Sequence, residues 1–218
     1  MKTSHSFNVR YLPWLMIKMS VDEKNSNFMG YFLLNNIIVL PIAAIFAAVT
    51  CVLTFIVPFT IPSTQGYINL GDIGVMISGL LFGPIVGGIA GGFGSALTDM
   101  FLAPQYAIPT LIIKGLEGFV VGLISDPRKN YSKLNIKDFF AVIIGGILMI
   151  LGYFIAEIIL YGFPSALVEL FFNGAVQFGL SAVVSLLFIG FARKPITTNL
   201  IQAFDKIYII EEREEISD

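Results

Sequence analysis

The chain has 218 residues, of which 56% are hydrophobic and only 13% are charged, and its mean hydropathy is +0.84. Soluble domains carry about 25% charged residues, so the sequence predicts that most of this protein lies in lipid. The net charge of −2 gives no indication of nucleic-acid binding. With one cysteine, Cys51, and one histidine, His5, the chain has no residues for Ser-His-Asp or Cys-His catalysis, a disulfide framework or a zinc site. We expect no metal and no cofactor.

Residues 1–35 form a polar N-terminal segment with one short apolar run, Tyr11 to Met19. This run is far shorter than the roughly 20 residues that a spanning helix needs. No small-residue cleavage site follows it, as a signal peptide would require. We interpret the segment as a cytoplasmic tail with an interfacial turn, or as the product of a misassigned start codon.

Six hydrophobic segments follow, and their lengths predict membrane-spanning helices, some of them tilted or short. A backbone in lipid must satisfy its own hydrogen bonds, as a helix does, and the segments do not alternate as β-barrel strands would. They run from about Asn36 to Val57, Leu70 to Gly83, Ile85 to Phe101, Ala107 to Ile124, Phe139 to Tyr161 and Val168 to Phe191. The sequence therefore predicts an all-α integral membrane protein, with a membrane domain at residues 36–192 and a cytoplasmic tail at residues 193–218.

The basic residues predict the orientation, because cytoplasmic loops carry an excess of Lys and Arg. With a cytoplasmic N-terminus, the inner segments are residues 1–35, the Gly83-Pro84 turn, residues 125–138 and residues 192–218. They contain every Lys and Arg residue except Lys114. Six transmembrane helices with both termini in the cytoplasm follow, in a multi-pass protein of the cell membrane.

Small residues recur at four-residue spacing in two segments. Gly83, Gly87, Gly91 and Ser95 allow helix backbones to approach closely in lipid, and we interpret them as internal packing. The first segment contains Ala43-Ala-Ile-Phe-Ala-Ala48, which either packs within the bundle or docks a partner. No soluble βαβ unit surrounds the glycines and no G-x-x-x-x-G-K-[ST] motif is present, so the chain does not hydrolyse nucleotides by that route.

Lys114 and Glu117 are charged residues within the apolar fourth segment. A charge near the bilayer centre costs about 2.5–3.5 kcal/mol on insertion scales, so each one requires an explanation. The two residues are one helical turn apart and can pair on one face, beside Gly115 and Gly118, where a neighbouring helix can approach. Two interpretations stay open: a structural ion pair, or part of a polar cavity that binds a ligand.

Other polar residues gather in the same outer half of the predicted bundle. Asn69 and Asp72 open the second segment and Asp99 closes the third, where exposed helix-end residues are the alternative interpretation. Four-residue spacing places Tyr153, Glu157 and Tyr161 on one face of the fifth helix, and Glu169, Asn173 and Gln177 on one face of the sixth. The cytoplasmic half has no matching stripe. We therefore predict a substrate-binding pocket open to the outside, formed by Asn69, Asp72, Asp99, Lys114, Glu117, Glu157, Tyr161, Asn173 and Gln177.

Several of these runs closely resemble the substrate-binding S components of energy-coupling factor (ECF) transporters, in particular the riboflavin-transporter-like group. The runs are Asn69-Leu-Gly-Asp72, Leu80-Leu-Phe-Gly-Pro84, Ala90 to Asp99 and Leu111-Ile-Ile-Lys-Gly-Leu116, with Gly152 to Gly162 and Asn173-x-x-x-Gln177 similar to that group's last two helices. The resemblance covers about residues 36–192. It implies a non-catalytic six-helix protein that captures a vitamin or related micronutrient from outside and works with a transmembrane coupling subunit and two cytoplasmic ATPase subunits.

The resemblance also implies roles for two other parts of the chain. In that family small residues on the first helix dock on the coupling subunit, and Ala44 and Ala48 match this pattern. The loop from Phe59 to Ile68 resembles the family's lid over the substrate. The N-terminal tail departs from the family's usual short start, and the acidic end from Glu211 to Asp218 matches no family feature.

Other classes of membrane protein are the alternatives, a purely structural one among them. A stand-alone secondary transporter commonly has its site near the midplane between repeats, and the sequence shows neither a convincing inverted repeat nor an inner polar pathway. An intramembrane aspartyl protease would use two aspartates on neighbouring helices. Such proteases carry a G-x-G-D motif, and the corresponding run here, Asn69-Leu-Gly-Asp72, lacks the first glycine.

Aromatic residues near the outer ends, such as Tyr67 and Tyr106, suit stacking on a flat heterocycle. Riboflavin, a thiamin precursor, pyridoxine, pantothenate and a cobalamin-type compound are the candidates.

Overall fold

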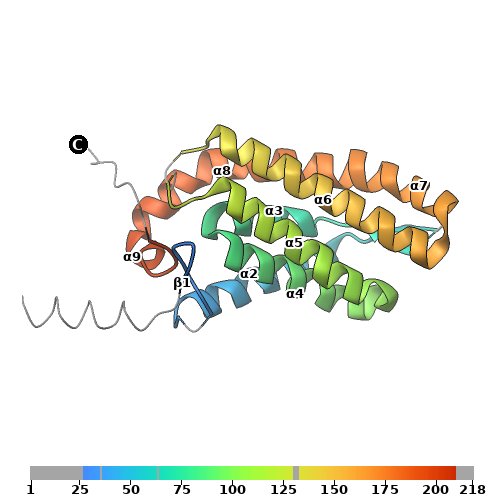
Figure 1. Cartoon of the computed structure of the whole chain (residues 1–218), viewed down its shortest axis with the longest axis horizontal. Helices are drawn as coiled ribbons and strands as arrows, with labels where there is room; N and C mark the ends of the chain where they lie inside the picture. Colours follow the sequence, from blue (N-terminus) through green and yellow to red (C-terminus); the bar gives the residue numbers. More distant parts are fainter. Residues whose placement is uncertain (1–26, 35, 63, 130–132, 210–218) are drawn as a thin grey trace, which may run out of the picture.

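The computed structural model describes residues 27–34, 36–62, 64–129 and 133–209, and its helices run up and down along one long axis (Figure 1). The helices are α2 (Val39–Ile56), α3 (Gly71–Phe82), α4 (Pro84–Leu102), α5 (Ala107–Ser125), α6 (Ile136–Tyr161) and the continuous run of α7 (Phe163–Phe171), η3 (Phe172–Phe178) and α8 (Gly179–Asn199). Among the described residues, five helical stretches are long and apolar enough to cross a membrane, and α3 is a shorter apolar helix. The predicted helical membrane architecture is confirmed, and each of the six hydrophobic segments corresponds to a helix.

The two ends of the bundle carry different small elements, and we name each end after a helix that marks it in Figure 1. The α7 end holds a hairpin of β3 (Phe59–Ile61) and β4 (Gly66–Ile68), the short helix η2 (Pro104–Tyr106) and the turn between α6 and α7. The α9 end holds a second hairpin, β1 (Asn27–Phe28) and β2 (Tyr31–Phe32), together with α9 (Ile201–Phe204). The predicted Tyr11–Met19 turn and the acidic end from Glu211 to Asp218 lie outside the described residues.

The last helical run is longer than the sequence indicated at both of its ends. It begins at Phe163 rather than near Val168, because Gly162, with φ of 86°, reverses the chain after α6, and Pro164 fits the first helical turn. It continues past Phe191 to Asn199, with Pro195 inside the helix. Arg193 lies within this helix, and its side chain is buried. The boundary expected at residue 192 therefore falls within a helix.

Helix α6 also begins earlier than expected, at Ile136 rather than at Phe139. A capping box explains the difference: the Asn135 side chain accepts a hydrogen bond from the backbone of Asp138, and the Asp138 carboxylate accepts one from the Asn135 backbone N–H. Such a box satisfies two N–H groups at a helix start. Because capping depends on residues outside the apolar run, hydropathy places this boundary too late.

Helix α3 lies in the middle of the bundle and contacts α2, α4, α5 and α8. Nearly all of its side chains are buried. Its 12 residues span about 18 Å, well short of the roughly 30 Å thickness of a bilayer core. The β3–β4 hairpin, which connects α2 to α3, occupies the α7 end of the bundle. Helix α3 therefore begins inside the bundle, on the inner side of this hairpin.

Helices α4 and α5 pack backbone against backbone. A Cβ atom at Gly87 would collide with the carbonyl of Gly118, and one at Gly91 would collide with the carbonyl of Lys114. These contacts confirm that the four-residue spacing of small residues serves internal packing. They also fix Lys114 against α4, with its side chain directed toward α3.

The α9 end is closed by an apolar cluster and by a buried ion pair. Tyr31, Phe82, Phe204 and Tyr208 contact one another there; the rings of Phe82 and Phe204 are stacked with centroids 5.4 Å apart. Beside them Arg193 donates to both carboxylate oxygens of Asp138, at 2.8 and 3.0 Å. These contacts join β2, α3, α6, α8 and α9 at one end of the bundle.

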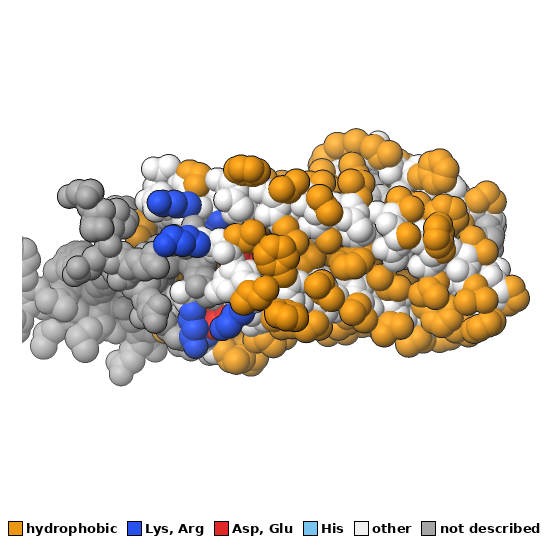
Figure 2. Space-filling model, turned by 90° about the horizontal axis from the view of Figure 1, so that it is seen from above, with side chains coloured by type: hydrophobic (Ala, Val, Ile, Leu, Met, Phe, Trp, Pro, Cys, Tyr) orange, Lys and Arg blue, Asp and Glu red, His pale blue; other side chains and the backbone are white. Residues whose placement is uncertain are grey.

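The surface has the distribution expected of a protein surrounded by lipid. The face shown in Figure 2 is hydrophobic over most of its length, and its Lys and Arg side chains gather toward one end. Large apolar residues are exposed along α2, α6 and α8, for example Ile45, Ile159 and Phe191. Extensive exposed apolar area of this kind marks a membrane-facing or partner-facing surface.

Candidate functional site

A small polar cavity lies at the α7 end, above the N-terminus of α3. Its volume is about 30 Å³, which is enough for about one or two water molecules. The hairpin, α4, η2, α6, α7 and η3 contribute its walls. The lining residues are Gly66, Tyr67, Asn69, Asp99, Tyr106, Tyr153, Glu157, Glu169, Asn173 and Gln177.

The β3–β4 hairpin closes one side of this cavity through contacts with three other elements. Thr64 donates to the Glu169 carboxylate on α7, and its carbonyl accepts a hydrogen bond from the Tyr106 hydroxyl at 3.4 Å. Tyr67 donates to Asp99 at the end of α4. Burial, the charge of Asp99 and the hydrogen bond to it raise the pKa of the Tyr67 phenol well above its ordinary value. The phenol therefore remains a donor, and it holds the hairpin against α4.

Glu157 on α6 and Glu169 on α7 bring two carboxyl groups to the same wall. The amide nitrogen of Asn173 lies 3.4 Å from Glu157 Oε1 and 3.3 Å from Glu169 Oε2, so one side chain donates to both. Gly66 lies so close that a Cβ atom there would collide with the Glu169 carboxylate. The Glu157 side chain is fully buried, and no described donor outside this carboxyl pair reaches its second oxygen; the Glu157 and Glu169 carboxyl groups interact with each other.

The last helical run is π-helical where it passes the cavity. Segment η3 carries Asn173 and Gln177, and both side chains are buried. Short π-helical segments inside α-helices occur frequently at functional sites. The polar stripe of Glu169, Asn173 and Gln177 faces the bundle interior as the four-residue spacing predicted, and the π-helical form was not foreseeable from that spacing.

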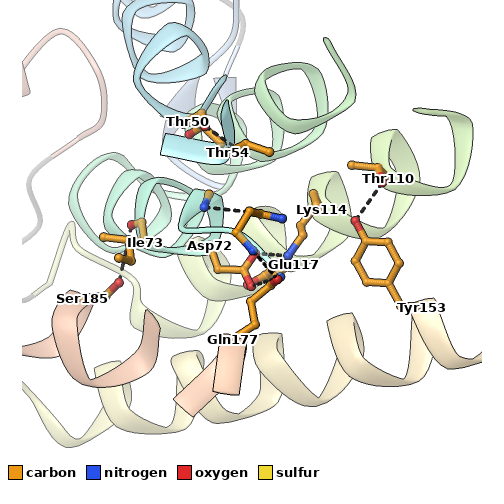
Figure 3. A network of polar contacts seen from close by, with 12 residues as sticks. Thr50, Thr54, Asp72, Ile73, Thr110, Lys114, Glu117, Tyr153, Gln177 and Ser185 are labelled. Atoms are coloured by element: carbon orange, nitrogen blue, oxygen red, sulfur yellow. Dashed lines mark hydrogen bonds and ion pairs between the residues drawn. The ribbon is translucent and has the colours of Figure 1, made fainter. Parts of the chain in front are cut away.

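A network of ionic and polar contacts forms the floor beneath the cavity (Figure 3). Lys114 contacts the carboxylate of Asp72 and lies 3.3 Å from Glu117, and all three side chains are buried. Gln177 links this floor to the cavity, because its amide donates to Asp72 at 2.8 Å and its carbonyl accepts from the Asn69 backbone at 3.0 Å. Asp72 also lies in the first turn of α3, where the helix dipole stabilises a negative charge.

The structure divides the sequence-predicted site residues into two groups. Asn69, Asp99, Glu157, Asn173 and Gln177 line the cavity. Asp72, Lys114 and Glu117 do not line it and form the floor network instead. Tyr161 also lies outside the lining; its ring stacks on Tyr106, with centroids 6.1 Å apart.

Other lining residues were absent from the predicted set, although the sequence carried a signal for most of them. Tyr153 and Glu169 belong to the same stripes as the predicted residues, and Tyr67 and Tyr106 are among the aromatic residues near the helix ends. Thr64 does not line the cavity but joins the hairpin to Glu169, and it had no signal beyond its place in the loop that resembles a lid. Its contact with Glu169 joins residues 105 positions apart, which only the folded chain reveals.

The acidic residues of this region are not arranged as a metal centre. No group of three or more His, Cys, Asp or Glu side chains that could hold a metal ion occurs in the described part of the chain. The cavity thus offers carboxylates, amides and phenol rings, which suit an organic molecule with hydrogen-bonding groups.

Comparison with known proteins agrees with this arrangement. Residues 35–195 match the family described as the S component of the ECF-type riboflavin transporter. An uncharacterized protein from the gap 3' region of Pyrococcus woesei is 47% identical over 126 residues, which cover 58% of this chain and 82% of that protein. The thiamine precursor transporter HmpT of Lactococcus lactis subsp. cremoris is 35% identical over 140 residues, which cover 63% of this chain and 78% of that protein. The polar cavity within an apolar helical bundle is therefore that of a membrane-embedded transport component, and the chain belongs to the family of ECF-type riboflavin transporter S components.

Proposed function

We propose that this protein is the substrate-binding subunit of an ECF-type importer, which captures a vitamin or related micronutrient from outside the cell. A transmembrane coupling subunit and two ATPase subunits would drive uptake. The observation that carries the proposal is the small polar cavity at one end of an apolar bundle, lined by acidic, amide and tyrosine side chains. Family membership over residues 35–195 supports it.

The distribution of basic residues supports an outward-facing cavity. Asp126, Arg128 and Lys129 follow the end of α5 and are linked to one another by ion pairs, and Arg193 is buried nearby at the α9 end. Cytoplasmic ends of membrane proteins are rich in Lys and Arg. The α9 end would then lie in the cytoplasm, and the cavity at the α7 end would open toward the outside.

The chemistry of the cavity supports a flat, ring-containing substrate. Tyr67, Tyr106 and Tyr153 contribute aromatic rings to its walls, and such rings stack on flat heterocycles. The family description names riboflavin, and the relative HmpT is described as a thiamine precursor transporter.

The cavity of about 30 Å³ is much smaller than the roughly 300 Å³ or more of a ligand pocket. Substrate entry would therefore require the β3–β4 hairpin to move away from Glu169.

Reconstitution in liposomes tests the proposed function directly. The purified chain alone is expected to bind substrate but not accumulate it, because it has no Walker A motif. Liposomes that also contain a coupling subunit and its ATPases are expected to accumulate the substrate when supplied with ATP. Accumulation by the isolated chain with only an ion gradient would instead identify a secondary transporter.

The exposed alanines of α2 predict where the coupling subunit docks. Ala44 and Ala48 are exposed on α2, whereas the adjacent Ala43 is fully buried. Small exposed residues allow a partner helix to approach closely. Replacing Ala44 and Ala48 with leucine is expected to reduce ATP-driven uptake at least about tenfold, a loss of about 1.4 kcal/mol in partner affinity, while substrate affinity changes less than about threefold.

Leucine at the buried neighbour provides the matched control. Ala43→Leu introduces the same bulk into the interior of the bundle and is expected to lower both thermal stability and substrate binding, since overpacking costs about 1–3 kcal/mol. If the Ala44→Leu, Ala48→Leu variant lost stability and binding to the same extent, these alanines would pack the bundle rather than dock a partner.

A further inference from the structure

A second hollow lies on the side of the bundle near the α9 end, and it is apolar. It is a groove of about 680 Å³ between α4, α5 and the residues that follow β2. The described lining consists of Leu33, Leu34, Pro84, Ile85, Gly88, Ile89, Gly115, Leu116 and Phe119. This volume would hold a ligand of ordinary size, but the described lining has no polar side chain to orient one. The groove therefore suits a set of apolar side chains.

The β1–β2 hairpin brings the chain to the edge of this groove. Leu33 and Leu34 continue from β2 into the lining. The ring of Phe28 on β1 lies against the ring of Phe119 in the lining, with centroids 6.2 Å apart. Asn27 begins β1 and belongs to the same hairpin. The residues that precede Asn27 thus join the described structure beside the groove.

Contacts with two other parts of the chain hold this hairpin in place. The backbone N–H of Phe32 donates to the carbonyl of Ile207 at 2.9 Å. Arg128, which follows α5, donates to the carbonyl of Met29 at the turn of the hairpin. The point at which residues 1–26 join the bundle is therefore fixed relative to the groove.

Those preceding residues contain the apolar run Tyr11–Met19 (YLPWLMIKM), which lies outside the described residues. The run is too short to span a bilayer, which takes roughly 20 residues. Asn27 follows Met19 by eight positions, and an extended chain of that length spans about 26 Å. A short flexible connection also keeps a segment at an effective concentration of the order of mM near its site. The run is thus within reach of the groove, and its attachment gives it an advantage over a free partner.

We propose that the run Tyr11–Met19 binds in the apolar groove between α4 and α5, with Trp14 and Leu15 against Leu116 and Phe119. The run leaves water when it binds, and its aromatic side chains have large apolar areas to bury. A lipid tail in the same groove gains little, because the bilayer already surrounds it with apolar groups. The run then covers the groove and fastens the β1–β2 hairpin to α4 and α5. This docking does not depend on which substrate the polar cavity binds.

Photo-cross-linking of the full-length chain identifies the occupant. The variant Leu116→p-benzoylphenylalanine is placed in phosphatidylcholine nanodiscs, irradiated and digested, and its cross-linked peptides are identified by mass spectrometry. The expected product joins position 116 to a residue of Tyr11–Met19 within one chain. The control is Ile144→p-benzoylphenylalanine on α6, because Ile144 is 45% exposed and Leu116 is 47% exposed; it is expected to give no such product. Cross-links from position 116 to lipid alone, or to a second copy of the chain, would overturn the proposal.

The rate of cysteine alkylation measures how strongly the run binds. In a Cys51→Ala background, Leu116→Cys is alkylated by a maleimide with and without the pair Trp14→Asp, Leu15→Asp. The pair is expected to accelerate alkylation at least about tenfold, which corresponds to about 1.4 kcal/mol of binding free energy.

Ile144→Cys in the same background provides the control, and its alkylation rate is expected to be the same with and without the pair. Thermal unfolding of each variant verifies that the bundle is folded. Equal alkylation of Leu116→Cys with and without the pair would show that the run lies elsewhere, and the proposal would fail.

Discussion

Replacing Arg193 with methionine is expected to lower the free energy of unfolding by about 3–5 kcal/mol, because it leaves the buried carboxylate of Asp138 without its cation. The guanidinium also donates to the carbonyl oxygens of Leu80 and Lys133, at 2.8 and 2.9 Å. One side chain on α8 therefore holds the last turn of α3 and the start of α6. Thermal unfolding of the purified protein in detergent measures the loss.

The next residue provides the control. Lys194 is exposed on α8, so Lys194→Met removes the same formal charge with little expected change in stability, as is typical of surface positions. A double variant, Arg193→Met with Asp138→Leu, is expected to recover part of the loss, because apolar residues often replace a buried ion pair. Recovery stays partial because Asp138 also caps α6. Unchanged stability in Arg193→Met alone would contradict the structural role of this ion pair.

Hydropathy predicted the helices well because most of the helix surface faces lipid and is therefore apolar. The boundaries that hydropathy missed are those set by other forces. Gly162 and Pro164 place the start of α7, and the Asn135–Asp138 capping box places the start of α6. The domain boundary expected after residue 192 falls inside α8, where Arg193 forms a buried ion pair with Asp138.

The sequence predicted the inward-facing side chains and a polar pocket, but not which of those side chains line it. Helical spacing identified Glu157, Asn173 and Gln177 as inward-facing, because that property depends only on the residue's own helix. The position of Asp72 depends on how deep the short helix α3 begins, which the sequence did not reveal. Asp72 lies in the first turn of its helix as predicted, but α3 begins inside the bundle, so Asp72 contacts Lys114, about 10 Å along α5 from its start.

The contact with Asp72 changes the role that we expect for Lys114. Lys114 contacts Asp72 and lies 3.3 Å from Glu117, and it does not line the cavity. Asp72 in turn accepts a hydrogen bond from Gln177, whose carbonyl accepts one from the Asn69 backbone. We propose that Lys114 is a positioning residue, which holds the floor of the cavity and thereby orients Gln177 and Asn69 toward the substrate.

Lys114→Met is therefore expected to cost about 3–5 kcal/mol of stability and to abolish substrate binding, because two carboxylates remain buried without a cation. The triple variant Asp72→Asn, Lys114→Met, Glu117→Gln removes all three charges at similar volume. It is expected to recover most of the stability and to bind substrate within about threefold of the original affinity, since a 0.6 kcal/mol change is about that factor. An asparagine at position 72 can still accept the hydrogen bond from Gln177.

Lys137→Met, at an exposed lysine on α6, controls for the loss of one positive charge. Thermal unfolding and ligand titration of the same samples decide between the two roles of Lys114. A triple variant that is stable but has lost its affinity would show that the Lys114 ammonium contacts the substrate itself, because the floor would then be intact while binding is gone.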